Sequence, residues 1–220
     1  GRHPRPGRMK APSFPLAVLG AALLGWGAAH GEQAAPNEAR EWAFSATVYP
    51  TLVRGADTYT SAIVTADRGA LHLEGRYNYE SVGARSAFVG WNFSGSAGDS
   101  LSWELTPLVG GAWGTTDAFV PGLEASVAWG PVDFYTEIEY VRPDDHSSRY
   151  LYAWNELGFK PVSWLRLGAA VQRTRAYGGD RNVQVGPFAQ LTWERFTLGG
   201  YWFNPGASDQ VVVMSLGIAF

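Results

Sequence analysis

The sequence predicts an all-β fold, an up-and-down antiparallel transmembrane β-barrel of about twelve strands. Apolar and polar residues alternate along most of the chain from residue 41 onward, which is the period of a strand with two unlike faces. Most alternating segments have the ~9–11 residues that a membrane-crossing strand needs, whereas average strands have ~5–6. Short turns alternate with longer polar loops, as expected for short periplasmic turns and modest extracellular loops.

The composition agrees with a single barrel. The chain has 220 residues, of which 17% are charged, below the roughly 25% of average soluble domains. It contains 27 glycines and no cysteine, so disulfide frameworks and thiolate chemistry are excluded. Beyond the N-terminal region no run of 18 apolar residues occurs, so the mature chain has no transmembrane-helix pattern.

The N-terminal region is predicted to be a targeting segment. Residues 1–8 precede the first methionine and are treated as upstream residues. Residues 9–31 have a basic start, a short apolar core and small residues before a cleavage site, as in a secretory signal peptide. Residues 32–40 are a polar periplasmic lead-in, and residues 41–220 form the barrel.

Each predicted strand is a segment in which one face is apolar. In 71–80, for example, Leu71 and Leu73 share one face, while His72, Glu74 and Arg76 share the other. In 149–159 either face could point outward, and we favour Leu157 outward and Glu156 inward because an ionised glutamate in lipid is costly. The predicted strands are 42–53, 58–66, 71–80, 86–94, 101–111, 118–129, 132–141, 149–159, 164–174, 182–193, 196–203 and 210–220.

The connections are predicted to differ between the two ends. Tight turns are expected at 66–69, 130–131, 160–162 and 193–196, with a longer connection at 94–100 on the same side. The longer loops are expected at 54–57, 80–85, 111–116, 142–148, 176–181 and 204–209. An even number of strands then places both ends of the barrel on the short-turn side.

Aromatic residues are expected at both membrane interfaces. Amphipathic rings gain at the headgroup level, so barrels carry two aromatic girdles. On the periplasmic side the expected membrane-interface residues are Trp42, Trp91, Trp103, Trp129, Trp193 and Phe220. Trp202 is expected near the other side, together with Tyr59, Tyr79, Phe119 and Tyr140.

The final segment, 211–220, has a wholly apolar face and a face of mostly small residues, and it ends on Phe220. This segment resembles the last strand of bacterial outer-membrane β-barrels, here of a small porin-like class with about twelve strands. The resemblance implies localisation in the outer membrane of a Gram-negative bacterium and contact with outer-membrane lipids. It also implies that the barrel-insertion machinery recognises the strand ending at Phe220, and that this strand pairs with the first.

The predicted lumen is rich in acids. The expected pore-lining residues are His72, Glu74, Arg76, Glu80, Glu104, Glu124, Asp133, Glu137, Glu139, Glu156 and Arg166. Such a lumen favours cations over anions, so we expect a narrow, passive, mildly cation-preferring channel for small solutes or cations. The alternative is a plugged barrel whose acids pair within hydrogen-bond networks and whose loops are displayed without transport.

Catalytic chemistry has one weak candidate. His146 and Ser148 are two residues apart, so on a strand they share a face. The pair resembles the His-x-Ser element of outer-membrane phospholipase A and lipid A deacylases, which implies a lipid hydrolase, although Arg149 stands where those families have Asn. We expect no enzyme, no cofactor, no metal site and no nucleic-acid partner. Twelve-stranded porins for oligogalacturonate and sialic acid carry basic lumens, unlike this one.

Overall fold

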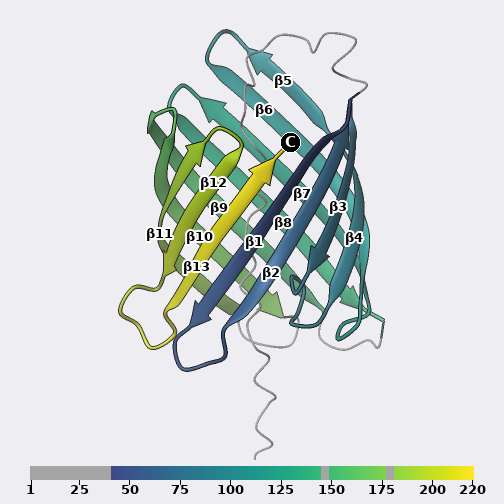
Figure 1. Cartoon of the computed structure of the whole chain (residues 1–220). Helices are drawn as coiled ribbons and strands as arrows, with labels where there is room; N and C mark the ends of the chain where they lie inside the picture. The colour runs from purple at the N-terminus through teal and green to yellow at the C-terminus, as the bar shows by residue number, and fades with distance from the viewer. Residues whose placement is uncertain (1–40, 145–148, 177–180) are drawn as a thin grey trace, which may run out of the picture.

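A computed structural model describes residues 41–144, 149–176 and 181–220 (Figure 1). In these residues every regular element is a β-strand, and all the strands belong to one sheet. The part of the chain that is described contains no helix long and apolar enough to cross a membrane. The predicted boundaries at 8, 31 and 40 lie outside the described residues and stay predictions.

The strands have the following bounds: β1 Ala43–Val53, β2 Tyr59–Arg68, β3 Leu71–Tyr77, β4 Arg85–Trp91, β5 Phe93–Ala97, β6 Leu101–Trp113, β7 Ala118–Trp129, β8 Val132–Pro143, β9 Tyr150–Val162, β10 Leu165–Ala176, β11 Arg181–Trp193, β12 Phe196–Phe203 and β13 Val211–Ala219.

The sheet closes on itself. Neighbouring strands pair antiparallel in chain order, β13 pairs with β1, and β4 pairs with β6. Twelve strands therefore form the closed barrel, as predicted. The thirteenth, β5, pairs only with β6 and continues the line of β4 after an interruption at Asn92. In Figure 1 the β5–β6 hairpin rises above one rim of the barrel.

The seam between the first and last strands is closed at Phe44 and Phe220. The Phe44 amide donates to the Phe220 carbonyl at 2.7 Å, and the Phe220 amide donates back to the Phe44 carbonyl at 2.9 Å. Their rings stack with centroids 5.8 Å apart. Because lipid offers no partner to an unpaired strand edge, this closure satisfies the backbone of both strands.

The two faces of the wall match the predicted alternation. Val64, Leu157 and Leu216 point outward and are exposed, whereas Tyr152 and Glu156 point inward and are buried. The orientation favoured for 149–159 is thereby confirmed. An apolar exterior is what a barrel presents to lipid, and it leaves the polar side chains inside.

Several local predictions were wrong. The 94–100 connection is largely strand, because β5 and the start of β6 form a hairpin beyond the barrel wall. The turn predicted at 160–162 belongs to β9, and the chain reverses after Val162 instead. Tyr79 was expected on the outside, but the backbone at Asn78 takes a positive φ of 54° and Tyr79 is fully buried.

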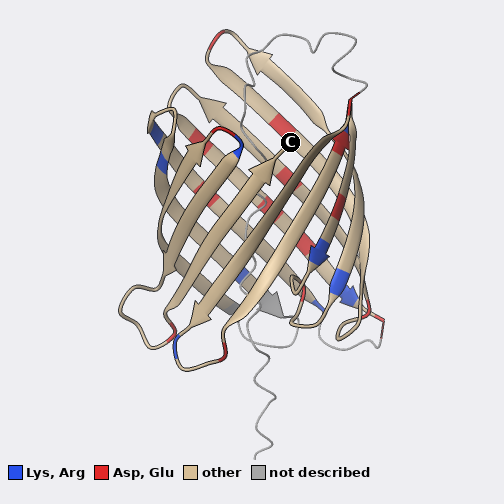
Figure 2. Ribbon diagram, viewed as in Figure 1, with Lys and Arg blue, Asp and Glu red and all other residues tan. Residues whose placement is uncertain are grey.

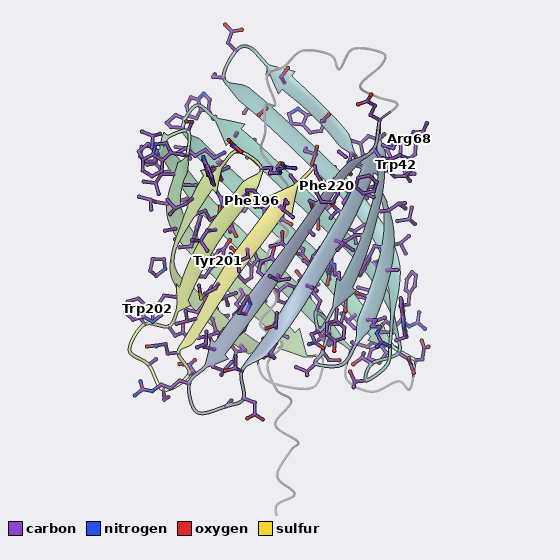
Figure 3. The ribbon with its side chains drawn as sticks, in the orientation of Figure 1. Trp42, Arg68, Phe196, Tyr201, Trp202 and Phe220 are labelled. Carbon is purple, nitrogen blue, oxygen red and sulfur yellow. The ribbon has the colours of Figure 1, made fainter. Side chains whose placement is uncertain are left out.

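The aromatic residues expected at the membrane interfaces are all exposed on the barrel exterior: Trp42, Trp91, Trp103, Trp129, Trp193, Trp202 and Phe220. Figure 3 shows Trp42 and Phe220 near one rim and Trp202 nearer the other. The guanidinium of Arg68 lies over the ring of Trp42 at 5.8 Å. Their positions agree with the expectation, and their contact with a membrane interface stays a prediction.

Candidate functional site

The candidate site is the acidic interior, and the pleat of the strands turns its side chains inward. On β3, alternation turns His72, Glu74 and Arg76 to one side, and all three are buried. Glu124 on β7 lies directly opposite Glu137 on β8 in the strand register, so two carboxylates face the same part of the interior. Figure 2 shows acidic positions recurring along several strands of the wall, with fewer basic positions among them.

Arg76 lies at the centre of this interior group. Its guanidinium donates to Glu74 and to Glu139 and lies 3.2 Å from a Glu137 oxygen. Two further carboxylates, of Glu80 and Glu124, lie 3.9 and 3.8 Å away. Charge-assisted hydrogen bonds of this kind are stronger than neutral ones. One cation therefore holds together acids from both sides of the interior.

Two aromatic rings enclose the same guanidinium. Its central carbon lies 4.2 Å from the ring centroid of Tyr79 and 4.3 Å from that of Phe88. The Tyr79 hydroxyl also donates to the Glu137 carboxylate, with oxygen–oxygen distances of 2.6 and 2.7 Å. Tyr79 belongs to the connection between β3 and β4, so this connection folds into the barrel and contacts the β8 wall.

The remaining member of the group, Glu80, lies in the connection between β3 and β4, outside the membrane-spanning strands. Its carboxylate accepts a hydrogen bond from the Ser86 hydroxyl at 2.6 Å. Burial raises the pKa of the Glu80 carboxyl, while the Arg76 guanidinium and the Ser86 hydroxyl lower it, and the net direction is upward. With Glu74, Glu80, Glu124, Glu137 and Glu139 around one guanidinium, acids greatly outnumber bases here.

A second ionic group surrounds Arg166. Its guanidinium donates to Asp133 at 2.9 and 3.1 Å, to Gln190 at 3.0 Å, and to Glu156. Glu156 also accepts from the Tyr201 hydroxyl at 2.8 Å. The Lys160 ammonium lies 3.9 Å from Asp133, so this group has two basic and two acidic side chains. The excess acid of the interior is therefore concentrated around Arg76.

Aromatic side chains narrow the interior between these two groups. Trp154 packs edge-on against Tyr201 and Phe203, with ring centroids 5.2 and 5.3 Å away. Tyr79 meets Tyr152 edge-on at 6.5 Å. These contacts join β9 to β12 and to the β3–β4 connection, so they cross the barrel rather than follow its wall.

The sequence-predicted site residues are thus divided between two groups and one outlier. Glu104 belongs to neither group and is half-buried toward the rim that carries β5. His146 and Ser148, the candidate hydrolase pair, lie outside the described residues. Sequence reasoning missed Asp67, whose carboxylate oxygen Oδ1 accepts a hydrogen bond from His72 Nδ1 at 2.8 Å. Asp67 was missed because the sequence predicted a turn at 66–69. In the structure Asp67 is still in β2 and lies opposite His72.

Comparison with known proteins gives structural neighbours alone. No protein-family profile and no curated protein sequence matches the chain. A solved structure of the KdgM porin is 10% identical, with a TM-score of 0.54 over 80% of this chain and 98% of that one. The KdgM porin in complex with disordered oligogalacturonate is 9% identical, with a TM-score of 0.53 over the same shares.

The chain has the fold of a small bacterial outer-membrane barrel. The likeness to the KdgM porin and the apolar exterior agree on this fold, which confirms the resemblance inferred from the sequence. A further neighbour, OmpT of Vibrio cholerae, is 8% identical with a TM-score of 0.37 over 82% of this chain and 97% of that one. This fold agrees with the outer-membrane location that the sequence predicts.

Proposed function

We propose that this porin-like barrel is a narrow, passive outer-membrane channel that prefers cations. The observation that carries the proposal is the excess of acid around Arg76. Five glutamates face one guanidinium inside the barrel, and three of them have a carboxylate oxygen within 3.2 Å of a guanidinium nitrogen. Acidic side chains lining a constriction attract cations and repel anions.

Electrostatics favours this direction of selectivity. Unit charges 4 Å apart interact by about 1 kcal/mol in bulk water and by about 4 kcal/mol at the effective dielectric near a protein surface. The carboxylates lie within a wall of aromatic and aliphatic side chains, so water screens them poorly. Arg76 balances only part of their charge, and a passing cation completes the balance. An anion meets the same charge as a barrier.

The cross-barrel aromatic contacts limit the size of the solute. Trp154, Tyr201 and Phe203 pack against one another, and Tyr79 meets Tyr152. A conducting path beside these rings suits inorganic cations or small cationic solutes. An oligogalacturonate, the ligand named for the KdgM porin, is a chain of carboxylate sugars. The acidic interior here opposes such a polyanion.

Planar-bilayer conductance of the refolded mature chain in a KCl gradient tests the proposal. We expect discrete conductance and a reversal potential displaced toward the equilibrium potential of K⁺. Glu137→Gln and Glu139→Gln should each reduce that displacement. The matched control is Asp99→Asn, which removes the same charge from the exposed tip between β5 and β6, and should leave the displacement unchanged. A reversal potential favouring chloride contradicts the proposal.

The second candidate is a plugged barrel without transport. The observation that favours it is the inward fold of the β3–β4 connection, whose Tyr79 hydroxyl is bonded to Glu137 on the opposite wall. Under this alternative the folded wild type shows no conductance in the bilayer, and Tyr79→Ala conducts. A wild type that conducts readily excludes the plugged barrel.

An outer-membrane channel also needs two kinds of partner. We propose that outer-membrane lipids contact the apolar exterior and that the barrel-insertion machinery engages β13 with Phe220. The proposal includes no chemical step. The lipid hydrolase alternative depends on His146 and Ser148, and Ser148→Ala tests it directly. If the wild type hydrolyses lipid and Ser148→Ala does not, the protein is a lipid hydrolase and the channel proposal is wrong.

A further inference from the structure

The environment of His72 is not explained by the ion pairs around Arg76. Its imidazole is fully buried, and Nδ1 lies 2.8 Å from an oxygen of Asp67. The other ring nitrogen, Nε2, has no hydrogen-bond partner among the described residues. It points toward Glu74, whose Oε2 lies 3.7 Å away and also has no hydrogen-bond partner there.

Glu124 completes this arrangement from another strand. Both of its carboxylate oxygens are buried and without a hydrogen bond in the described part of the chain. One ligand atom each from His72, Glu74 and Glu124 can be chosen so that all three lie within 4.8 Å of one another. Buried polar atoms are normally hydrogen-bonded, and a group of unbonded ones needs an explanation such as an ion.

The hydrogen bonds behind His72 orient it as metal-bound histidines are oriented. Asp67 contacts Nδ1, so in the neutral imidazole it favours the tautomer whose proton is on Nδ1 and whose Nε2 lone pair is directed at the glutamates. Asp67 is held in turn by the Asn92 amide at 2.8 Å, and Asn92 accepts from the Thr106 hydroxyl at 2.7 Å. Carboxylate–histidine pairs of this kind raise the basicity of the ligand and fix its ring.

We propose that His72, Glu74 and Glu124 bind one divalent transition-metal ion of the Zn²⁺ type inside the barrel. One imidazole and two carboxylates suit Zn²⁺, Co²⁺ or Ni²⁺, whereas Ca²⁺ and Mg²⁺ prefer oxygen ligands alone. In a tetrahedral site with bonds of 2.0–2.1 Å, neighbouring ligand atoms lie about 3.3 Å apart. The His72–Glu74 separation of 3.7 Å is already close to that spacing.

Charge balance supports a divalent ion. Glu74 uses one oxygen for Arg76 and has the other directed at His72. The guanidinium has Glu137 and Glu139 as further partners and meets Glu124 only at 3.8 Å, through Nη2, so Glu124 is not hydrogen-bonded to it. A neutral imidazole and two carboxylates then carry two negative charges, which a divalent ion neutralises. The site does not require the barrel to conduct.

Co²⁺ binding to the refolded full barrel in detergent micelles tests the inference, because bound Co²⁺ absorbs in the visible range. We expect one Co²⁺ per chain, displaced by Zn²⁺ and not by an equal concentration of Ca²⁺. His72→Gln and Glu124→Gln should abolish the absorption or weaken binding by more than tenfold. Asp67→Asn, which keeps all three ligands, should weaken binding about 10–100-fold through its loss of support for His72.

Asp99→Asn is the matched control, since it removes a carboxylate from the exposed tip between β5 and β6, away from the three ligands. Its Co²⁺ affinity should equal that of the wild type, and heat-modifiable gel mobility verifies that every variant is folded. Three results overturn the inference: no saturable one-to-one binding by the folded wild type, unchanged binding in His72→Gln, or displacement by Ca²⁺ as effective as by Zn²⁺. The first leaves His72 as an ion-pair partner of Asp67 and Glu74. None of them bears on cation preference, which the bilayer experiment measures.

Discussion

Replacing Arg76 with methionine should destabilise the barrel severely. The arginine side chain is fully buried, as are the side chains of Glu74 and Glu80, and Glu124, Glu137 and Glu139 are at most 3% exposed. Removing one partner of a buried ion pair costs about 3–5 kcal/mol, because the remaining charge stays buried without compensation. At 1.4 kcal/mol per factor of ten, the unfolding equilibrium shifts roughly a hundredfold to a few thousandfold.

Urea titration of the barrel in lipid vesicles, followed by the fluorescence of the nine tryptophans in residues 41–220, measures this loss. Arg68→Met is the control, since Arg68 is exposed at the rim and lies over Trp42 at 5.8 Å. Its loss should stay below about 1 kcal/mol, the value of an exposed cation–π contact. Adding Glu139→Gln to Arg76→Met should recover part of the stability. If Arg76→Met unfolds within 1 kcal/mol of the wild type, the carboxylates do not depend on the guanidinium, and the charge argument for cation preference fails too.

Three further predictions follow from single contacts. Tyr79→Phe removes the hydrogen bond to Glu137 and should cost about 1.5–3 kcal/mol, as for a hydrogen bond to a charged group, in the same urea assay. Gly110→Ala should cost about 1–3 kcal/mol, because the added methyl meets a backbone carbonyl and a phenyl ring, whereas Gly200→Ala has open space and should stay within about 0.5 kcal/mol. The raised pKa of Glu80 imposes an ionisation penalty on the folded state that is absent below the ordinary glutamate pKa of about 4.3 and complete above the raised one. Urea midpoints of the wild type should therefore fall relative to Glu80→Gln as the pH rises from 4 to 8, and parallel midpoints would contradict this.

The barrel itself could be predicted because its signals are local. Alternation reports which face of a strand is apolar, and it assigned Leu157 and Glu156 to opposite faces although an asparagine interrupted the pattern. It failed where the backbone leaves the strand conformation. The positive φ at Asn78 turns Tyr79 inward, and nothing in the neighbouring residues announces that reversal. The extension of β5 and β6 beyond the wall depends on pairing between two segments, not on either alone.

For the acidic interior, the sequence predicted which residues point inward but not which of them contact one another. Alternation gave the inward direction of Glu74, Glu124 and Glu137, but it could not show which acids meet. Arg76 contacts Glu139 across 63 positions of sequence. His72 comes within 4.8 Å of Glu124 although β4 and β6 lie between β3 and β7 in the sheet. Of the three proposed metal ligands, only His72 and Glu74 are close in the sequence, and Glu124 is fifty positions away from Glu74. Such contacts are set by the circumference and tilt of the barrel, which the sequence pattern does not contain.

The seam between β1 and β13 also decides the order of events during biogenesis. β1 is synthesised first and β13 last, so the hydrogen bonds between Phe44 and Phe220 cannot form until nearly the whole barrel has left the ribosome. Closing so long a loop costs little more entropy than closing one of half the length, because that cost grows only with the logarithm. The time that β1 spends without β13 matters more than this entropy. Until β13 arrives, β1 presents an unsatisfied edge that invites pairing with other chains, and the nascent protein must be kept apart from them.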